Sequence, residues 1–329
     1  MDSFKAFRIH SPAGGDDARL ETISLDDLSD GEVVIRGEYS SINYKDALAG
    51  TGAGRILRSY PLVGGVDIAG TVAESSDSRF SAGDRVVVCG CGLSETRDGG
   101  FAQFARVPAD AVNPLPAELD TRTAMGVGTA GFTAALAIHR MEHNGQHPEL
   151  GPIAVNGATG GVGSLAVDML SGLGYEVTAM TSKTTAQDYL QGLGATQIMN
   201  LKTTEFGQRP LEKAVWGGAV DSLGGDILGW LTRTVRPGGN IASIGLAAGV
   251  DLKTTVMPFI LRGVNLLGIN SVEVAPAERA DVWARIASDL RPRHLDAIAT
   301  REVGLSELAA QLPAYIEGNI TGRTIVRLQ

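Results

Sequence analysis

The chain has 329 residues, of which 43 are glycine, 43% are hydrophobic and 20% are charged. Its 28 lysines and arginines against 37 aspartates and glutamates give a formal net charge of −9. Such apolar content excludes a disordered chain, and the acidic balance argues against nucleic acid or an anionic membrane as the main partner. The glycines cluster without a three-residue period, which excludes a collagen-like chain. The length suits about two domains.

The sequence holds two cysteines, Cys89 and Cys91, too few for a disulfide framework or a four-cysteine zinc module. It begins without the basic start and apolar stretch of a signal peptide, and no run approaches the ~18 apolar residues that cross a bilayer. We therefore expect a cytoplasmic protein that does not insert into a membrane.

The first third of the chain is predicted to be rich in β-structure. Residues 32–39 and 84–89 form apolar or alternating runs bounded by turn residues, which is typical of strands. Glycine-rich stretches at 50–54 and 63–67 lie between them. We therefore expect an irregular β domain with functional loops.

A helix is predicted from Thr129 to about Met141, ended by Asn144-Gly145. Its last turn contains His139 and His143 in an H-x-x-E-H pattern, which formally matches an inverted zincin motif. We interpret them as polar residues at a helix C-terminus, where protonated histidine is favoured.

From Pro152 onward, strands and helices alternate. Helices are expected between most of the strands, including 184–193, ended by Gly194, and 228–235, ended by Pro237-Gly238-Gly239. The alternation predicts an α/β fold with a doubly wound parallel sheet. A helix at 277–290 and a strand at 324–328 are too short for a domain of their own, so we expect them to complete the first one. The six predicted strands of the sheet are 153–156, 176–180, 197–200, 219–222, 240–244 and 265–269.

The segment 155–164, VNGATGGVGS, follows a predicted strand and opens a predicted helix. Its glycines let the backbone turn sharply and approach a pyrophosphate, and a helix N-terminus offers free N–H groups and partial positive charge. Gly157, Gly160 and Gly163 are spaced by three, which departs from strict G-x-G-x-x-G. We predict a dinucleotide site, the alternative being a tight strand-to-helix turn without a ligand.

The second strand of this predicted unit ends in Thr181, Ser182 and Lys183, with no acid that could hold a ribose 2′-hydroxyl. Hydroxyls and one ammonium suit a 2′-phosphate, so the sequence favours NADPH over NADH. The alternative for Lys183 is an ordinary solvated lysine.

The whole pattern resembles the medium-chain dehydrogenase/reductase superfamily. Zinc-dependent members bind a catalytic metal through a first cysteine and a Gly-His-Glu segment. This sequence has Asn43 in place of that cysteine and Val66-Asp67 in place of His-Glu, so we expect no metal. We interpret Cys89 and Cys91 as small residues near a turn.

The resemblance narrows to the zinc-independent, quinone oxidoreductase-like YhdH/YhfP subgroup, which includes acrylyl-CoA reductases. It implies a six-stranded Rossmann sheet at 125–268 and a GroES-like irregular β-barrel catalytic domain formed by 1–124 and 269–329. It also implies a homodimer that pairs through the strand near 265–269. The segments that carry the resemblance are Ser40 to Asp46, Gly128 to Ala134, Arg209 to Asp221 and Thr254 to Arg262.

The same resemblance assigns site residues. Tyr44 would lie beside the nicotinamide ring, with Asn43 as its catalytic neighbour, and Arg323 would lie near the active-site cleft among the cofactor-binding residues. We also interpret Asn43 and Asp46 as residues that fix their loop through backbone hydrogen bonds, which for Asn43 is the alternative to a catalytic role. The remaining implied contacts are Thr159, Gly160, Gly161, Val162 and Gly163 on the pyrophosphate, Thr181, Ser182 and Lys183 at the adenosine phosphate, and Leu246, Ile260 and Ser271 along the nicotinamide half.

The subgroup's reaction is reduction of an activated C=C bond, which implies an enoyl-CoA substrate such as acrylyl-CoA. Hydride would add to the β-carbon, and the resulting enolate would need stabilising donors and a proton at the α-carbon. Tyr44 is one candidate proton donor, and water is the other, with Tyr44 then stacking on the cofactor. The alternative functions are NADPH:quinone oxidoreductase and a non-catalytic NADPH-binding sensor.

Overall fold

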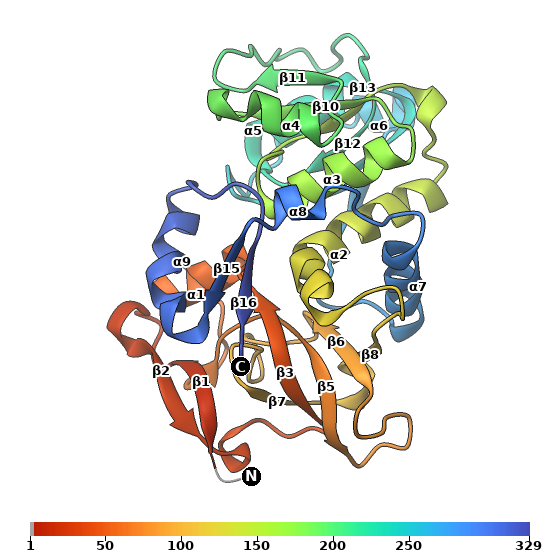
Figure 1. Cartoon of the computed structure of the whole chain (residues 1–329). Helices are drawn as coiled ribbons and strands as arrows, with labels where there is room; N and C mark the ends of the chain where they lie inside the picture. The colour runs from red at the N-terminus through yellow and green to blue at the C-terminus, as the bar shows by residue number, and fades with distance from the viewer. Residues whose placement is uncertain (1–2) are drawn as a thin grey trace. The chain divides into compact units, whose positions relative to one another are not determined.

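The structure is a computed structural model of the chain, and it describes residues 3–329 (Figure 1). The described chain forms two compact units. Unit 1 contains the residues up to 129 together with 272–287 and 295–329, and unit 2 contains 130–271 and 288–294. The domain boundaries expected after residues 124 and 268 lie close to these divisions and stay a prediction.

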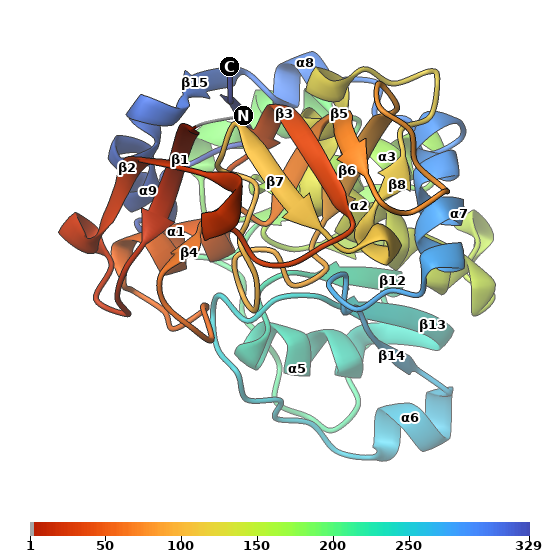
Figure 2. The same cartoon turned by 90° about the horizontal axis from the view of Figure 1, so that it is seen from below.

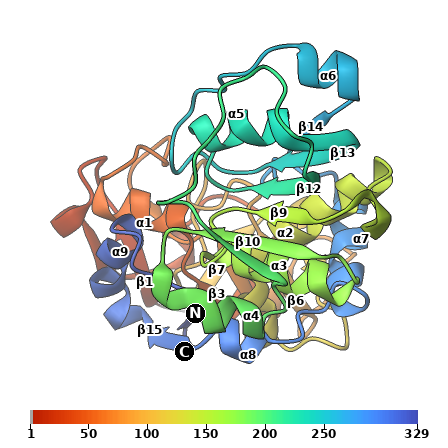
Figure 3. The same ribbon diagram turned by 90° about the horizontal axis from the view of Figure 1, so that it is seen from above.

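Unit 2 contains a six-stranded parallel sheet in the order β11-β10-β9-β12-β13-β14. Figure 3 shows β10, β9, β12, β13 and β14 of this sheet side by side. The predicted doubly wound sheet is therefore confirmed. Helices α3 (Gly161–Gly172) and α4 (Gln187–Gly192) pack on the β9 to β11 half, and α5 (Gly225–Thr234) and α6 (Met257–Arg262) pack on the other half. The strands are β9 (Ile153–Val155), β10 (Val177–Thr181), β11 (Gln197–Asn200), β12 (Trp216–Asp221), β13 (Val235–Ser243) and β14 (Asn265–Gly268).

The central strands of this sheet are buried along their whole length, as expected in a doubly wound parallel sheet. Every residue of β9, β10 and β12 is buried. The chain leaves β9 toward β10 on one side, while β12 pairs with β9 on the other. The strand order thus reverses at β9 and β12, and the carboxyl ends of these strands are where a doubly wound sheet binds its ligand.

The helix predicted over 228–235 was wrong at its C-terminal end. Helix α5 ends at Thr234, and β13 begins at the next residue and runs through Pro237, Gly238 and Gly239. The register with β12 shifts between Trp216 and Gly218, so the first part of β13 lies in an irregular stretch that tolerates a proline. Gly239 packs so closely on the Gly217 carbonyl that a Cβ would collide with it. These glycines therefore permit a close strand contact and do not end the helix.

Unit 1 is built mainly of β-structure (Figure 2). A seven-stranded sheet has the order β15-β16-β3-β5-β6-β8, with β7 paired to β3, and a smaller sheet has the order β2-β1-β4. The strands predicted at 32–39 and 84–89 are confirmed as β3 and β6, and β16 pairs antiparallel with β3. The strands are β1 (Phe4–Ile9), β2 (Ala18–Ile23), β3 (Val33–Ser41), β4 (Leu62–Val63), β5 (Asp67–Ser75), β6 (Arg85–Cys89), β7 (Phe104–Val107), β8 (Asn113–Pro114), β15 (Arg301–Gly304) and β16 (Thr324–Arg327).

The helices of unit 1 include α1 (Tyr44–Thr51) and α9 (Leu308–Ile316), which pack on each other, and also α7 (Pro276–Ala287) and α8 (Leu295–Ile298). Helix α2 (Thr121–His143) starts earlier than the predicted Thr129, and Gly128 interrupts it with a non-helical conformation. The division between the units falls inside α2. No helix within residues 3–329 is long and apolar enough to cross a membrane.

Candidate active site

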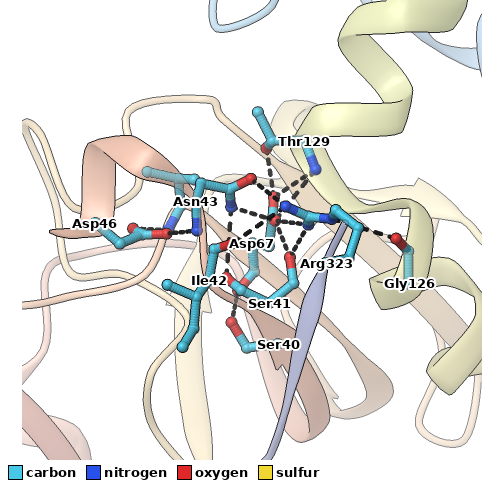
Figure 4. Close-up of polar contacts among 10 residues, drawn as sticks. Ser40, Ser41, Ile42, Asn43, Asp46, Asp67, Gly126, Thr129 and Arg323 are labelled. Carbon is cyan, nitrogen blue, oxygen red and sulfur yellow. Dashed lines mark hydrogen bonds and ion pairs between the residues drawn. The ribbon is translucent and has the colours of Figure 1, made fainter. Parts of the chain in front are cut away.

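Asp67 is the centre of a buried polar network in unit 1 (Figure 4). It is the first residue of β5 and its side chain is fully buried. Its carboxylate accepts hydrogen bonds from Asn43 Nδ2 at 2.7 Å, from the Ser41 hydroxyl, and from both the backbone N–H and the hydroxyl of Thr129. Hydrogen bonds of this number satisfy a carboxylate that burial has removed from water.

Arg323 supplies the positive charge of the same network and is only 2% exposed. Its guanidinium donates to Gly126 O at 3.3 Å, Ile42 O at 3.1 Å, Asn43 Oδ1 at 2.9 Å and Ser41 Oγ at 2.6 Å, and it lies 3.7 Å from Asp67 Oδ2. All three guanidinium nitrogens of Arg323 donate hydrogen bonds to other residues of unit 1, so Arg323 holds these residues together. The expected contact of Arg323 with a cofactor stays a prediction.

Asn43 lies between these two charged groups. Its amide nitrogen donates to Asp67 and its amide oxygen accepts from Arg323. The two bonds determine which end of the amide is which, because a carboxylate accepts only and a guanidinium donates only. The side chain that precedes Tyr44 is therefore fixed in one orientation.

Gly128 makes room for this network. It has φ +53°, and a Cβ at this position would collide with Arg323, Ser41 and Asp67. The break in α2 also directs the Thr129 N–H and hydroxyl to Asp67. The structure therefore gives a steric reason for a glycine at position 128, before Thr129, which the sequence did not indicate.

Tyr44 is the first residue of α1, and the residue is 45% exposed. The neighbouring Asn43 is buried. A large aromatic side chain at the surface beside a rigid buried network is available to a ligand. The structure thus places the two expected catalytic residues on one segment, with Asn43 inside the network and Tyr44 accessible.

Sequence reasoning missed most of the network. Ser41, Asp67 and Thr129 were not among the expected site residues, although Val66-Asp67 was noted as standing in place of the His-Glu pair of zinc-dependent members. The sequence pattern that could have indicated them is the occurrence of small hydroxyl and carboxyl residues at the ends of two strands and in a helix that a glycine interrupts.

In unit 2, the glycine segment connects β9 to α3, with Gly160 as the N-cap of that 12-residue helix. A Cβ on Gly163 would collide with the Gly157 carbonyl, so only glycine allows the helix to start this close to the loop. Residues 159–163 therefore lie at the N-terminus of α3, where N–H groups and the helix dipole favour an anion.

Asn156 and Asp221 connect this loop to the end of β12. Asn156 donates to the Asp221 carboxylate and accepts from Ser222 N at 2.7 Å, and Gly224 N donates to Asp221 at 3.1 Å. Burial raises the pKa of Asp221, while the bonds from Asn156 and the backbone oppose that rise. These residues, also missed from the sequence, fix the two loops beside the carboxyl ends of β9 and β12.

A hollow of about 490 Å³ lies beside the ends of β10 and β11. Thr181 and Lys183 line it, and Ser182 between them is exposed. Within the described part of the chain, no carboxylate is among its lining residues, which suits a phosphate better than an unmodified ribose. The lining consists of Thr181, Lys183, Thr184, Gln187, Gln191, Thr196, Gln197, Ile198 and Asn200.

The three residues expected along the nicotinamide half lie in different places of unit 2. Leu246 is exposed and lines a second hollow of about 250 Å³ after β13. Ile260 is exposed on α6 and lines neither hollow, and Ser271 accepts a hydrogen bond from the Thr133 hydroxyl at 2.8 Å. The structure does not group these three, and their contact with a cofactor stays a prediction.

Residues 29–117 match the alcohol dehydrogenase GroES-like domain family, and residues 161–288 match the zinc-binding dehydrogenase family. "Putative quinone oxidoreductase YhfP" of Bacillus subtilis is 46% identical over 326 residues, which is 99% of each chain. The chain belongs to the medium-chain dehydrogenase/reductase family. Members of this family use a nicotinamide cofactor, and the protein is accordingly an oxidoreductase, as expected.

Other relatives place the protein in the YhdH/YhfP subgroup. "Acrylyl-CoA reductase AcuI" of Ruegeria pomeroyi is 47% identical over 95% of each chain. The crystal structure of the Salmonella enterica yhdH oxidoreductase in complex with NADP has a TM-score of 0.95 and 42% identity, covering 99% of this chain and 100% of that one. A crystal structure of B. subtilis yhfP with NAD bound also has a TM-score of 0.95, at 45% identity over 100% of both chains.

Zinc, which the name of one matching family implies, does not fit the residues of this chain. The Asn43 side-chain amide is bonded to Asp67 and Arg323, and the Val66 side chain has no atom that could bind a metal ion. Burial and the nearby Asp67 charge raise the pKa of the Cys89 thiol well above its ordinary value, which disfavours the thiolate that zinc requires. Among the described residues, no group of three or more His, Cys, Asp or Glu side chains could hold a metal ion.

Proposed function

We propose that the protein reduces the C=C bond of an α,β-unsaturated acyl-CoA, such as acrylyl-CoA, with NADPH. The observation that carries this proposal is the 47% identity to acrylyl-CoA reductase AcuI across 95% of both chains. The network at Asn43 and the accessible Tyr44 support it, because a rigid site next to an accessible donor suits reduction of an activated double bond.

NADPH is the proposed cofactor, and when bound it supplies the hydride. Residues 159–163 at the start of α3 hold its pyrophosphate, and Thr181, Ser182 and Lys183 hold its adenosine phosphate. The acid-free hollow at Lys183 and the NADP complex of the Salmonella relative support this choice. Because the structure of the relative yhfP contains NAD, the activity with NADPH should be compared with the activity with NADH.

The residues of unit 1 prepare the acceptor for reduction. Asp67 and Arg323 hold Asn43 in one orientation, so the segment that presents Tyr44 needs little reorganisation during the reaction. Tyr44 donates the proton to the α-carbon of the substrate, or it packs against the cofactor while water donates that proton. Either role uses its exposed position at the start of α1.

The proposal is tested by NADPH oxidation with acrylyl-CoA, crotonyl-CoA and a benzoquinone, measured side by side with NADH as the alternative donor. Turnover of the two thioesters well above that of the quinone supports the proposal. Turnover of the quinone alone replaces it with the second candidate, an NADPH:quinone oxidoreductase. That candidate is favoured by the name of the B. subtilis relative.

We also propose that the protein is a homodimer. Strand β14 is the outermost of the described strands on its side of the sheet, and its residues are partly exposed or exposed. Light scattering after size-exclusion chromatography tests the proposal, and a single monomer mass at all concentrations contradicts it. The exposed apolar side chains near this edge in the sequence are Leu246, Val250, Leu252, Val256, Ile260 and Leu261.

A further inference from the structure

Asp46 is a second buried carboxylate, and the reaction proposed above does not use it. It lies in the first turn of α1 and is only 2% exposed. Its oxygens accept two backbone N–H groups, one from Asn43 at 2.8 Å and one from Val66 at 3.0 Å. Asn43 precedes the exposed Tyr44, and Val66 precedes the network carboxylate Asp67.

The two hydrogen bonds join two segments that are far apart in the sequence. Asp46 binds the main chain of Asn43, while Asp67 and Arg323 bind its side chain (Figure 4). The second bond connects α1 to the start of β5. The main chain of the Asn43-Tyr44 segment is therefore joined to the start of β5 by one carboxylate that accepts both N–H groups.

We propose that Asp46 is a positioning residue whose carboxylate holds the Asn43-Tyr44 segment against the start of β5, and that protonation of this carboxylate slows turnover. This inference rests on the proposed function in one respect, because it requires Tyr44 to contact the substrate or the cofactor. An anionic carboxylate accepts hydrogen bonds on both oxygens, whereas the neutral acid has one oxygen that carries a proton and accepts weakly.

The charges that face Asp46 give this dependence its direction. Burial, together with the negative charge of Asp67, raises the pKa of Asp46 to about 7, although the N–H groups of Asn43 and Val66 oppose the rise. From α9, Tyr315 faces the same region, and burial is the main cause that raises its pKa. Arg323 lies 3.7 Å from Asp67, and the charges of Arg323 and Arg301 oppose the rise in the pKa of Tyr315. Turnover is therefore expected to rise as pH increases through about 7.

The structure offers a matched control in Asp27. Asp27 follows Ser24 as Asp46 follows Asn43, and it accepts the Ser24 N–H at 2.8 Å in the same kind of capping box. Asp27 is exposed, and its hydrogen bonds with Ser24 lower its pKa. Replacing it removes a capping carboxylate without touching the Asn43-Tyr44 segment.

The experiment compares Asp46→Asn, Asp46→Glu and Asp27→Asn with the unchanged protein. It measures kcat with saturating donor and the best acceptor, from pH 6 to 8.5, and NADPH affinity by fluorescence. We expect Asp46→Asn to lower kcat by roughly 10- to 100-fold at pH 8, the loss that a small misplacement of reacting groups causes. The kcat of Asp46→Asn should no longer rise through pH 7, and its NADPH affinity should change less than about two-fold. Asp46→Glu should regain part of the pH dependence of kcat. Asp27→Asn should match the unchanged protein.

An Asp46→Asn protein with unchanged kcat and pH profile overturns the inference. Amide hydrogen exchange of the unchanged protein provides a second test that needs no variant and no substrate. Corrected for intrinsic rates, protection of residues 43–50 should fall as pH decreases from 8 to 6, while that of 24–28 should not. Constant protection at 43–50 contradicts the inference even if acyl-CoA turnover is found, and pH-dependent protection supports it even if that substrate is rejected.

Discussion

The two units form their candidate sites in different ways. In unit 1, side chains from β3, the N-cap of α1, β5, α2 and the segment before β16 form a buried network around Asp67. In unit 2, the site consists mainly of backbone atoms, because glycines allow the loop after β9 to pack closely against the first turn of α3. The first site depends on charges that must be paired, and the second depends on the absence of side chains. Substitutions should therefore affect the stability of unit 1 and the ligand affinity of unit 2.

The largest effect is expected from Arg323→Met. It leaves the buried Asp67 carboxylate without its cation, which costs about 3–5 kcal/mol of unfolding free energy. Urea unfolding measures this loss, with Arg301→Met, a partly exposed arginine on β15, as control. Adding Asp67→Asn should recover part of the loss, and an Arg323→Met protein as stable as the control would mean that the network carries no stability.

Tyr44→Phe should have the next largest effect, on turnover and not on stability. If Tyr44 donates the proton, kcat falls by roughly 100-fold or more, the usual contribution of general acid catalysis. NADPH affinity should remain nearly unchanged, as measured by fluorescence titration, with Tyr39→Phe on β3 as control. A large loss of NADPH affinity with little change in kcat would assign Tyr44 to packing on the cofactor.

Gly163→Ala should weaken NADPH binding by about ten-fold or more, equivalent to about 1.4 kcal/mol. The added Cβ collides with the Gly157 carbonyl and displaces the loop from the helix N-terminus. Gly172→Ala at the other end of α3 is the control, because its Cβ would make ordinary contact with Arg293. Equal affinities of the two variants would remove the glycine loop from the cofactor site.

The smallest effect is expected from Lys183→Ala, which should raise the KM for NADPH by a few-fold and leave that for NADH unchanged. A point charge near a phosphate contributes about 1 kcal/mol at an exposed site. Initial rates with both donors measure it, and Lys202→Ala, an exposed lysine that does not line the hollow, is the control. An equal rise for both donors would assign Lys183 to general surface charge.

The same contrast explains what the sequence could predict. Six apolar strands alternating with helices, and a glycine loop between two of them, are local patterns, and the structure confirms both the sheet and the place of the loop. The network could not be found this way, because Arg323 and Ser41 lie 282 positions apart and no local periodicity links them. The path of Pro237 through β13 also depended on tertiary pairing with β12, which overrides the usual meaning of a proline-glycine pair.

The place of Arg323 in the chain has a consequence for synthesis on the ribosome. Every residue of unit 2 precedes Arg323, whereas Ser41, Asn43 and Asp67 precede unit 2. The dinucleotide unit is therefore translated in full while Asp67 still lacks its cation, and domains generally fold as units in the order of their synthesis. Unit 2 can therefore begin to fold before the Asp67–Arg323 ion pair of unit 1 forms.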